Sequence, residues 1–169
     1  MVSQKLIKAL NDQFNYELLS AHYYLAMASY CSDQDLDGMS TFFKAQAEEE
    51  RFHAMKFYDY ITEVDGRVLI TDISTPQNNF KSATDVFKVA LEHEQSVTKR
   101  VYGLMDIAQE EKEHATRNFL NWFVQEQVEE EATMKTIIKR LERLGNDNHG
   151  LFMLDQELGQ RVFTPPTAE

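Results

Sequence analysis

Apolar residues recur every three or four positions through most of the chain, which is the spacing of one face of an α-helix. Stripes of this kind cover residues 3–31, 36–64, 82–109 and 113–144, and they predict four long helices. Ser3 is suited to cap the first helix, and Gly145 to end the last one. The stripe positions are Leu6, Leu10, Phe14, Ala21, Tyr24, Ala28, Met39, Phe43, Ala47, Ala54, Phe57, Ile61, Val64, Phe87, Leu91, Val97, Val101, Met105, Ala108, Leu120, Phe123, Met134, Ile137 and Leu141.

The connections between these segments differ in length. The polar residues 32–35 make a short link, so the first two helices should be antiparallel neighbours. No Gly or Pro separates the third helix from the fourth, and we infer a break there because one helix of about sixty residues would be far longer than is usual. After Gly145, the spacing of Leu151, Leu154 and Leu158 predicts a small fifth helix over residues 151–160.

Residues 65–81 contain Gly66, Pro76 and a polar run, and are expected to be irregular. About 16 extended residues span roughly 50 Å, whereas a helix of about 28 residues is roughly 42 Å long. The segment can therefore return to the other end of the bundle and place the third helix parallel to the second. The predicted fold is a single all-α domain over residues 1–169, a four-helix bundle with one long crossover.

Each stripe is interrupted by polar residues near its midpoint. Helices of similar length that pack side by side bring their midpoints level, so these inward side chains should meet in one layer. The interrupting residues are Glu17 in the first helix, Glu50 and His53 in the second, Glu94 in the third, and Gln127 and Glu130 in the fourth.

Four buried carboxylates need a counter-ion, or they must take up protons. No Lys or Arg lies on the inner stripes at this level, so a metal ion is the natural partner, and an oxygen-rich set with one imidazole suits iron. Glu50 and His53 are three residues apart and can bind one ion together. A lone Glu-x-x-His in an acidic helix is usually surface decoration, and the alternative for the whole set is a bundle of protonated or solvated glutamates.

The composition limits the function further. Seventeen basic and 28 acidic residues give a net charge of −11, which disfavours binding to nucleic acid or anionic membranes. The N-terminus lacks the pattern of a signal peptide and no stretch is long and apolar enough to span a membrane, so we expect a cytoplasmic protein. The single cysteine, Cys31, lies on an apolar stripe and is expected to be a packed thiol.

At these interrupting positions the sequence resembles the haem-free bacterial ferritins over nearly its whole length. The resemblance implies a ferritin-like fold, a first iron held by Glu17, Glu50 and His53, and a second held by Glu50, Glu94 and Glu130 with Gln127 beside it. It also implies a third iron site, formed by Glu49, Glu126 and Glu129 with Glu130 and lying nearer the central cavity of a ferritin cage. A solvated run of glutamates is the alternative for these residues.

The same resemblance makes Tyr24 an electron donor to the irons, with core packing of a hydrogen-bonded hydroxyl as the alternative. Trp122 lies off the stripe and is expected to pack, or to serve as a second electron source. His22, His93, His114 and His149 fit no motif, and we expect them at the surface.

Related families differ at identifiable positions. Bacterioferritin has Glu-x-x-His where this chain has Gln127 and Glu130, and its haem-ligating methionine would fall at Arg51, so no haem is expected. Rubrerythrin-like peroxidases carry a second Glu-x-x-His, and often a cysteine-ligated iron domain. The miniature DNA-protecting ferritins lack the intra-bundle set and often have a basic tail, whereas residues 164–169 contain no basic side chain.

The expected function is iron storage and detoxification by a ferroxidase that oxidises Fe(II) with O2 or H2O2 and deposits a ferric mineral. The resemblance alone implies a homo-oligomeric cage of 24 subunits. Glu110, Glu111 and Glu113 could line a pore or form a solvated run. A metal-free helical interaction module is the alternative, and it predicts no stoichiometric uptake of Fe(II).

Overall fold

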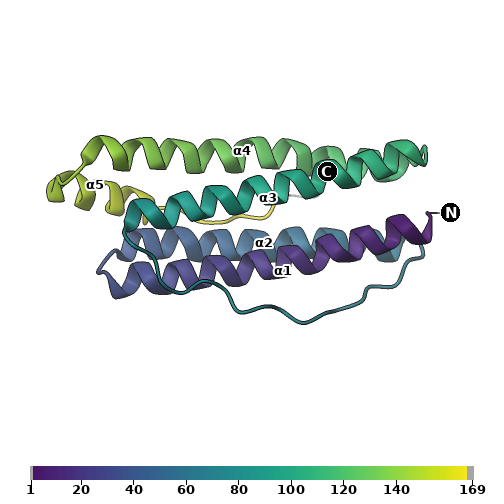
Figure 1. Ribbon diagram of the computed structural model, residues 1–169, viewed down its shortest axis with the longest axis horizontal. Coiled ribbons are helices and arrows are strands. Elements are labelled where there is room, and N and C mark those ends of the chain that lie inside the picture. Colours follow the sequence, from purple (N-terminus) through teal and green to yellow (C-terminus); the bar gives the residue numbers. More distant parts are fainter. Residues whose placement is uncertain (1, 167–169) are drawn as a thin grey trace.

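The computed structural model describes residues 2–166, and within that range the secondary structure is entirely helical (Figure 1). Met1 and residues 167–169 of the predicted domain lie outside the described residues. No described helix has a stretch apolar enough to cross a membrane.

The predicted all-α fold is confirmed. The helices are α1 (Gln4–Asp33), α2 (Asp37–Glu63), α3 (Ala83–Glu110), α4 (His114–Leu144) and α5 (Asn148–Leu158).

Local signals explain most helix ends. The Ser3 hydroxyl accepts a hydrogen bond from the Leu6 amide, and the Ser82 hydroxyl accepts one from Asp85, so each serine satisfies a free N–H at a helix start. Gly145 ends α4 with a φ of +55°, in the left-handed region that favours glycine. Lys112 takes a φ of +56° between α3 and α4, so this break is made by a residue that carries no sequence signal.

The helix α5 begins three residues before its predicted start. The Asp147 side chain accepts a hydrogen bond from the His149 amide at 3.1 Å and so caps the helix N-terminus. The polar run 146–150, which precedes the predicted fifth helix, therefore supplies the cap and the first residues of α5. The helix also ends at Leu158, two residues earlier than predicted.

The long crossover runs along the whole bundle from the end of α2 to the start of α3 (Figure 1). It makes α3 parallel to α2, as its length predicted. Two asparagines of α1 hold its first part: Asn11 binds the Arg67 carbonyl and the Leu69 amide, and Asn15 binds the Leu69 carbonyl and the Thr71 amide. These side chains satisfy backbone groups that have no partner strand or helix.

The apolar core is divided into two clusters, one toward each end of the bundle. One contains Tyr24, Phe43, Phe87 and Met134, and the other contains Phe14, Phe57, Val97 and Phe123, among further residues. Most of the predicted stripe is buried; the partly exposed members are Val64, Leu91, Met105 and Leu151. The polar layer described next lies between the two clusters.

Candidate metal centre

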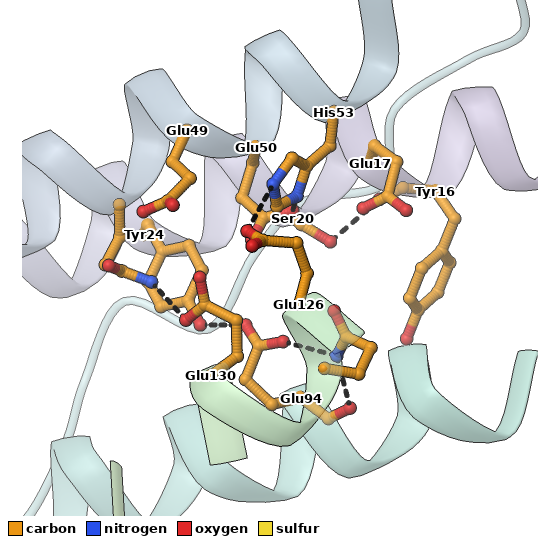
Figure 2. A network of polar contacts seen from close by, with 12 residues as sticks. Tyr16, Glu17, Ser20, Tyr24, Glu49, Glu50, His53, Glu94, Glu126 and Glu130 are labelled. Atoms are coloured by element: carbon orange, nitrogen blue, oxygen red, sulfur yellow. Dashed lines mark hydrogen bonds and ion pairs between the residues drawn. The ribbon is translucent and has the colours of Figure 1, made fainter. Parts of the chain in front are cut away.

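The structure gathers the six interrupting side chains at mid-bundle, with contributions from all four long helices. Their carboxyl, imidazole and amide groups point inward, and Figure 2 shows the labelled carboxylates facing a common space. All are at most 5% exposed, so solvent does not stabilise their charges. They are Glu17 from α1, Glu50 and His53 from α2, Glu94 from α3, and Gln127 and Glu130 from α4.

In one half of the layer, possible ligand atoms have no hydrogen-bond partner. One ligand atom each from Glu17, Glu50 and His53 can be chosen so that all three lie within 4.8 Å of one another. The Oε2 atoms of Glu17 and Glu50 and the Nε2 atom of His53 are buried without a hydrogen-bond partner. Buried polar atoms are nearly always paired, so three unpaired atoms in one place indicate room for a cation.

The other half is held by hydrogen bonds. The Gln127 amide donates to Glu94 Oε2 at 2.9 Å and to the Glu94 main-chain carbonyl at 3.2 Å. The Tyr24 hydroxyl donates to Glu94 Oε1, so both carboxylate oxygens of Glu94 are engaged (Figure 2). This arrangement fixes the Glu94 side chain toward the layer.

Two buried glutamines that are absent from the predicted set of site residues also contact the layer. Gln13 donates to Glu17 Oε1 at 2.7 Å, and Gln46 donates to Glu130 Oε2 at 2.9 Å. Gln13 precedes Glu17 by four residues and Gln46 precedes Glu50 by four, so each shares a helix face with a ligand candidate. That spacing is the signal that could have identified them.

Burial dominates the electrostatics of the layer. It raises the pKa of Glu50, which Glu94 raises further, and it also raises the pKa of Glu94. Burial, with Glu94 and Glu49 nearby, raises the pKa of Glu130 to about 8. Burial alone would lower the pKa of His53, but the carboxylates of Glu126 and Glu50 outweigh it and raise that pKa. Without a metal ion, the site therefore favours protonated carboxyl groups.

A second group of possible ligands, named the outer group, shares His53 with the layer but is more exposed than the layer. Atoms of Glu49, His53 and Glu126 lie within 4.8 Å of one another, and Glu126 Oε2 is 3.8 Å from His53 Nε2. They line a cleft of about 420 Å³, to which Glu129 also contributes. The expected third set was Glu49, Glu126, Glu129 and Glu130, whereas the close group contains His53 instead of Glu129 and Glu130.

The aromatic side chains near the layer take different positions. Tyr24 is fully buried, and burial raises the pKa of its hydroxyl well above 10. Trp122 is partly buried and meets His53 edge-on, with the ring centres 5.4 Å apart.

The Cys31 thiol is buried, and burial raises its pKa to about 12, which makes it an unreactive packed side chain.

The expectation of a surface position was wrong for His93. Its ring is 6% exposed, stacks on Tyr16 and lies 2.7 Å from the Ser20 hydroxyl. Burial lowers the pKa of His93 to about 4, so the ring is neutral at pH 7. His22, His114 and His149 are exposed as expected.

Comparisons with known proteins agree with this architecture. A family model described as a ferritin-like domain matches residues 7–144. The chain is 46% identical over 163 residues to the "Bacterial non-heme ferritin" of Staphylococcus aureus strain MRSA252, across 96% of this chain and 98% of that protein. It is 47% identical to the protein of the same name from Staphylococcus haemolyticus strain JCSC1435, with the same coverage.

Solved structures of ferritins superpose closely on the chain. A humanized archaeal ferritin gives a TM-score of 0.97 at 44% identity, covering 98% of this chain and 100% of that chain. An open-pore ferritin from the archaeon Archaeoglobus fulgidus gives 0.94 at 43% identity, covering 95% and 99%. The chain therefore belongs to the ferritin family, and its function is iron storage with ferroxidase activity.

Proposed function

We propose that the mid-bundle layer binds two Fe(II) ions as substrates and oxidises them together. Glu17, Glu50 and His53 hold the first ion. Glu50, Glu94 and Glu130 hold the second, with Gln127 beside it, so that Glu50 bridges the two. The observation that carries this assignment is the set of buried, unpaired ligand atoms on Glu17, Glu50 and His53.

The charge balance of the layer supports the binding of divalent cations. The pKa values of Glu50, Glu94 and Glu130 are raised, and the Oε2 atom of Glu17 has no hydrogen-bond partner. Two dications between these four groups would stabilise their carboxylate forms. Metal binding should therefore release protons from the layer. The neutral Gln127 amide binds a metal more weakly than a carboxylate would, which favours release of the ferric product.

The proposed reaction is that of an oxidoreductase acting on Fe(II) with oxygen as acceptor. Each Fe(II) gives up one electron, and O2 takes up the two electrons with two protons to form H2O2; H2O2 itself can serve as the oxidant in its place. Two ions held close together allow both electrons to be delivered in one encounter. Tyr24, hydrogen-bonded to Glu94, is placed to supply a further electron.

A third metal position fits the outer group. The proposed ligands for iron that leaves the paired site are Glu49 and Glu126, with Glu129 of the same cleft and Glu130 of the mid-bundle layer. His53 belongs both to the close group with Glu17 and Glu50 and to this outer group. No haem is proposed, because Arg51 stands where a haem-ligating methionine would be needed.

The proposed working form is a cytoplasmic cage of 24 copies that encloses the ferric mineral. Large apolar side chains are exposed on the crossover, namely Leu69, Ile70 and Ile73, and on α5, namely Phe152 and Met153. Exposed apolar groups of this kind are typical of surfaces that contact another copy. The relatives with which the chain superposes are themselves named ferritins.

The proposal is tested by adding Fe(II) anaerobically to the metal-free protein, admitting air, and following ferric absorbance and particle size. Glu50→Gln should slow oxidation at least about 100-fold, because it removes the carboxylate shared by both ions. Glu48→Gln, an exposed neighbour on the same helix, should keep the wild-type rate. Equal oxidation rates for wild type and Glu50→Gln would overturn the assignment of the paired site. No stoichiometric uptake of Fe(II) by wild type would favour a metal-free interaction module instead.

A further inference from the structure

The segment after α5 lies over the outer group of carboxylates. Residues 159–166 leave α5 at one end of the bundle and run back toward its middle, where the candidate metal centre lies (Figure 1). The Phe163 ring packs on Phe52 of α2, with the centres 5.6 Å apart. This segment forms one wall of the cleft whose other walls include Glu49, His53 and Glu126.

One side chain of this segment binds a candidate metal ligand directly. Arg161 Nη2 donates to Glu49 Oε2 at 2.7 Å, and the two side chains are only 28% and 14% exposed. The guanidinium also lies over the Phe42 ring, 4.8 Å from its centre. The pair joins residues 112 positions apart, so it connects the C-terminal segment to α2 at the level of the metal centre.

The guanidinium is held incompletely. Arg161 Nε is buried without a hydrogen-bond partner, so the group has one described ion pair and an unsatisfied donor. A fork-shaped guanidinium is best stabilised when both of its donor edges are used. Arg161 is therefore held by one charge-assisted hydrogen bond to Glu49 and by its contact with the Phe42 ring.

We propose that Arg161 is the resident counter-ion of the outer metal position, and that a metal ion must displace it to bind Glu49. This inference rests on the proposed function, since it assumes that Glu49 and Glu126 take a metal ion. A guanidinium and a dication cannot share the Glu49 carboxylate without strong mutual repulsion. Residues 159–166 thus form a strap that is closed when the outer position lacks metal and released when metal arrives.

The strap gives the outer position a built-in competitor. Metal binding at the outer position must offset the loss of the Arg161–Glu49 ion pair. This cost lowers the metal affinity of that position alone and favours onward movement of the ion. The paired centre has no such competitor, because among the described residues no Lys or Arg forms an ion pair with Glu17, Glu50, Glu94 or Glu130. Arg161 is accordingly a positioning residue and takes no part in the redox chemistry.

The test is calorimetric titration of the metal-free full-length protein with Zn²⁺, which has the charge of Fe(II) and is not oxidised. Arg161→Gln should tighten the weakest class of Zn²⁺ sites about five- to tenfold and leave the tighter classes unchanged. Arg161→Lys, which keeps the charge, should stay within about twofold of wild type. Arg140→Gln is the matched control, because it breaks the exposed pair of Arg140 with Glu157 of α5, away from the cleft.

A second measurement follows the strap itself. Val162 is 80% exposed, and a spin label on Val162→Cys should report motion there, while the buried Cys31 stays unlabelled. In the labelled Val162→Cys protein that keeps Arg161, Zn²⁺ should increase the label's mobility at the stoichiometry of the weakest sites. When Arg161→Gln is combined with the labelled Val162→Cys, the label should be mobile already, and Zn²⁺ should have no further effect.

The outcomes separate this inference from the proposed function. If wild type binds no Zn²⁺ and Glu50→Gln changes nothing, the metal centre itself is wrong. If wild type binds Zn²⁺ normally while Arg161→Gln gives the same or weaker affinities, or the label's mobility ignores Zn²⁺, then Arg161 is only a packing residue and the strap is overturned.

Discussion

Glu130 illustrates how a buried carboxyl group couples metal binding to stability. It is 5% exposed, accepts a hydrogen bond from Gln46, and has a pKa of about 8 against an ordinary value of 4.5. In the folded metal-free protein it holds a proton over a pH range in which the unfolded chain has lost it. Folding therefore takes up a proton between these two values, and stability must fall as pH rises through this range.

The corresponding prediction concerns the metal-free protein prepared with a chelator. Its unfolding midpoint should fall by several degrees between pH 5 and pH 8, since each kcal/mol corresponds to about 2–4 °C for a chain of this size. Glu130→Gln, which cannot titrate, should show a smaller fall, and Zn²⁺ should reverse the fall in wild type. Glu92→Gln, an exposed neighbour of the layer, should follow wild type. A fall in Glu130→Gln as large as in wild type would contradict the assignment.

The sequence revealed the charged members of the layer and Gln127, but not the neutral partners Gln13 and Gln46. A glutamate at a stripe position is conspicuous, because burying it is costly, and so Glu17, Glu50, Glu94 and Glu130 could be chosen from spacing alone. Gln13, Gln46 and His93 lie beside the stripes, where a polar residue is ordinary. Only the neighbouring helix decides whether such a side chain faces solvent or a hydrogen-bond partner.

The junction of α2 and α5 depends on one glycine. The Asp155 carboxylate of α5 accepts hydrogen bonds from the Gly38 and Met39 amides and so caps the start of α2. A Cβ at Gly38 would lie 1.7 Å from the Asp155 main-chain carbonyl oxygen, a distance that only backbone movement can relieve. The close approach of the two helices therefore requires glycine.

Gly38→Ala is expected to lower the free energy of unfolding by about 2–3 kcal/mol, through overpacking and loss of the Asp155 cap. Gly103→Ala is the matched control, since a Cβ there meets nothing within 4 Å and alanine is the better helix former. Chemical denaturation of both variants checks this. Equal stability of the two variants would mean that α5 shifts without cost.

The helices themselves were more predictable than their boundaries. Long stripes define α1 to α4 because burial of one face dominates their stability. The break at Lys112 and the early start of α5 depend on single backbone conformations and on one capping side chain, Asp147. Such local choices leave little trace in a pattern averaged over several turns.

For the whole molecule, the length of the crossover decides the topology. A short link after α2 would have produced a simple up-down-up-down bundle, whereas residues 65–81 reach back along α1 and make α3 parallel to α2. This could be predicted from residue count and helix length. The anchoring of the crossover by Asn11 and Asn15 could not, because both residues suit an exposed helix face equally well.

The path of residues 159–166 could not be predicted from the sequence either. The segment has no periodicity, and its position follows from two long-range contacts, Arg161 with Glu49 and Phe163 with Phe52. The net charge of −11 is consistent with a molecule that handles cations, but it does not place them. Placement comes from the four helices meeting at one level.

The central claim is that two iron ions bind between the four helices at mid-bundle. Crystals of the metal-free protein soaked anaerobically in Fe(II), with diffraction data collected at the iron absorption edge, test it most directly. Two strong anomalous peaks per subunit are expected, one beside Glu17 and His53 and one beside Glu94 and Glu130, with Glu50 between them. Peaks only at the protein surface, or no peak inside the bundle, would contradict it.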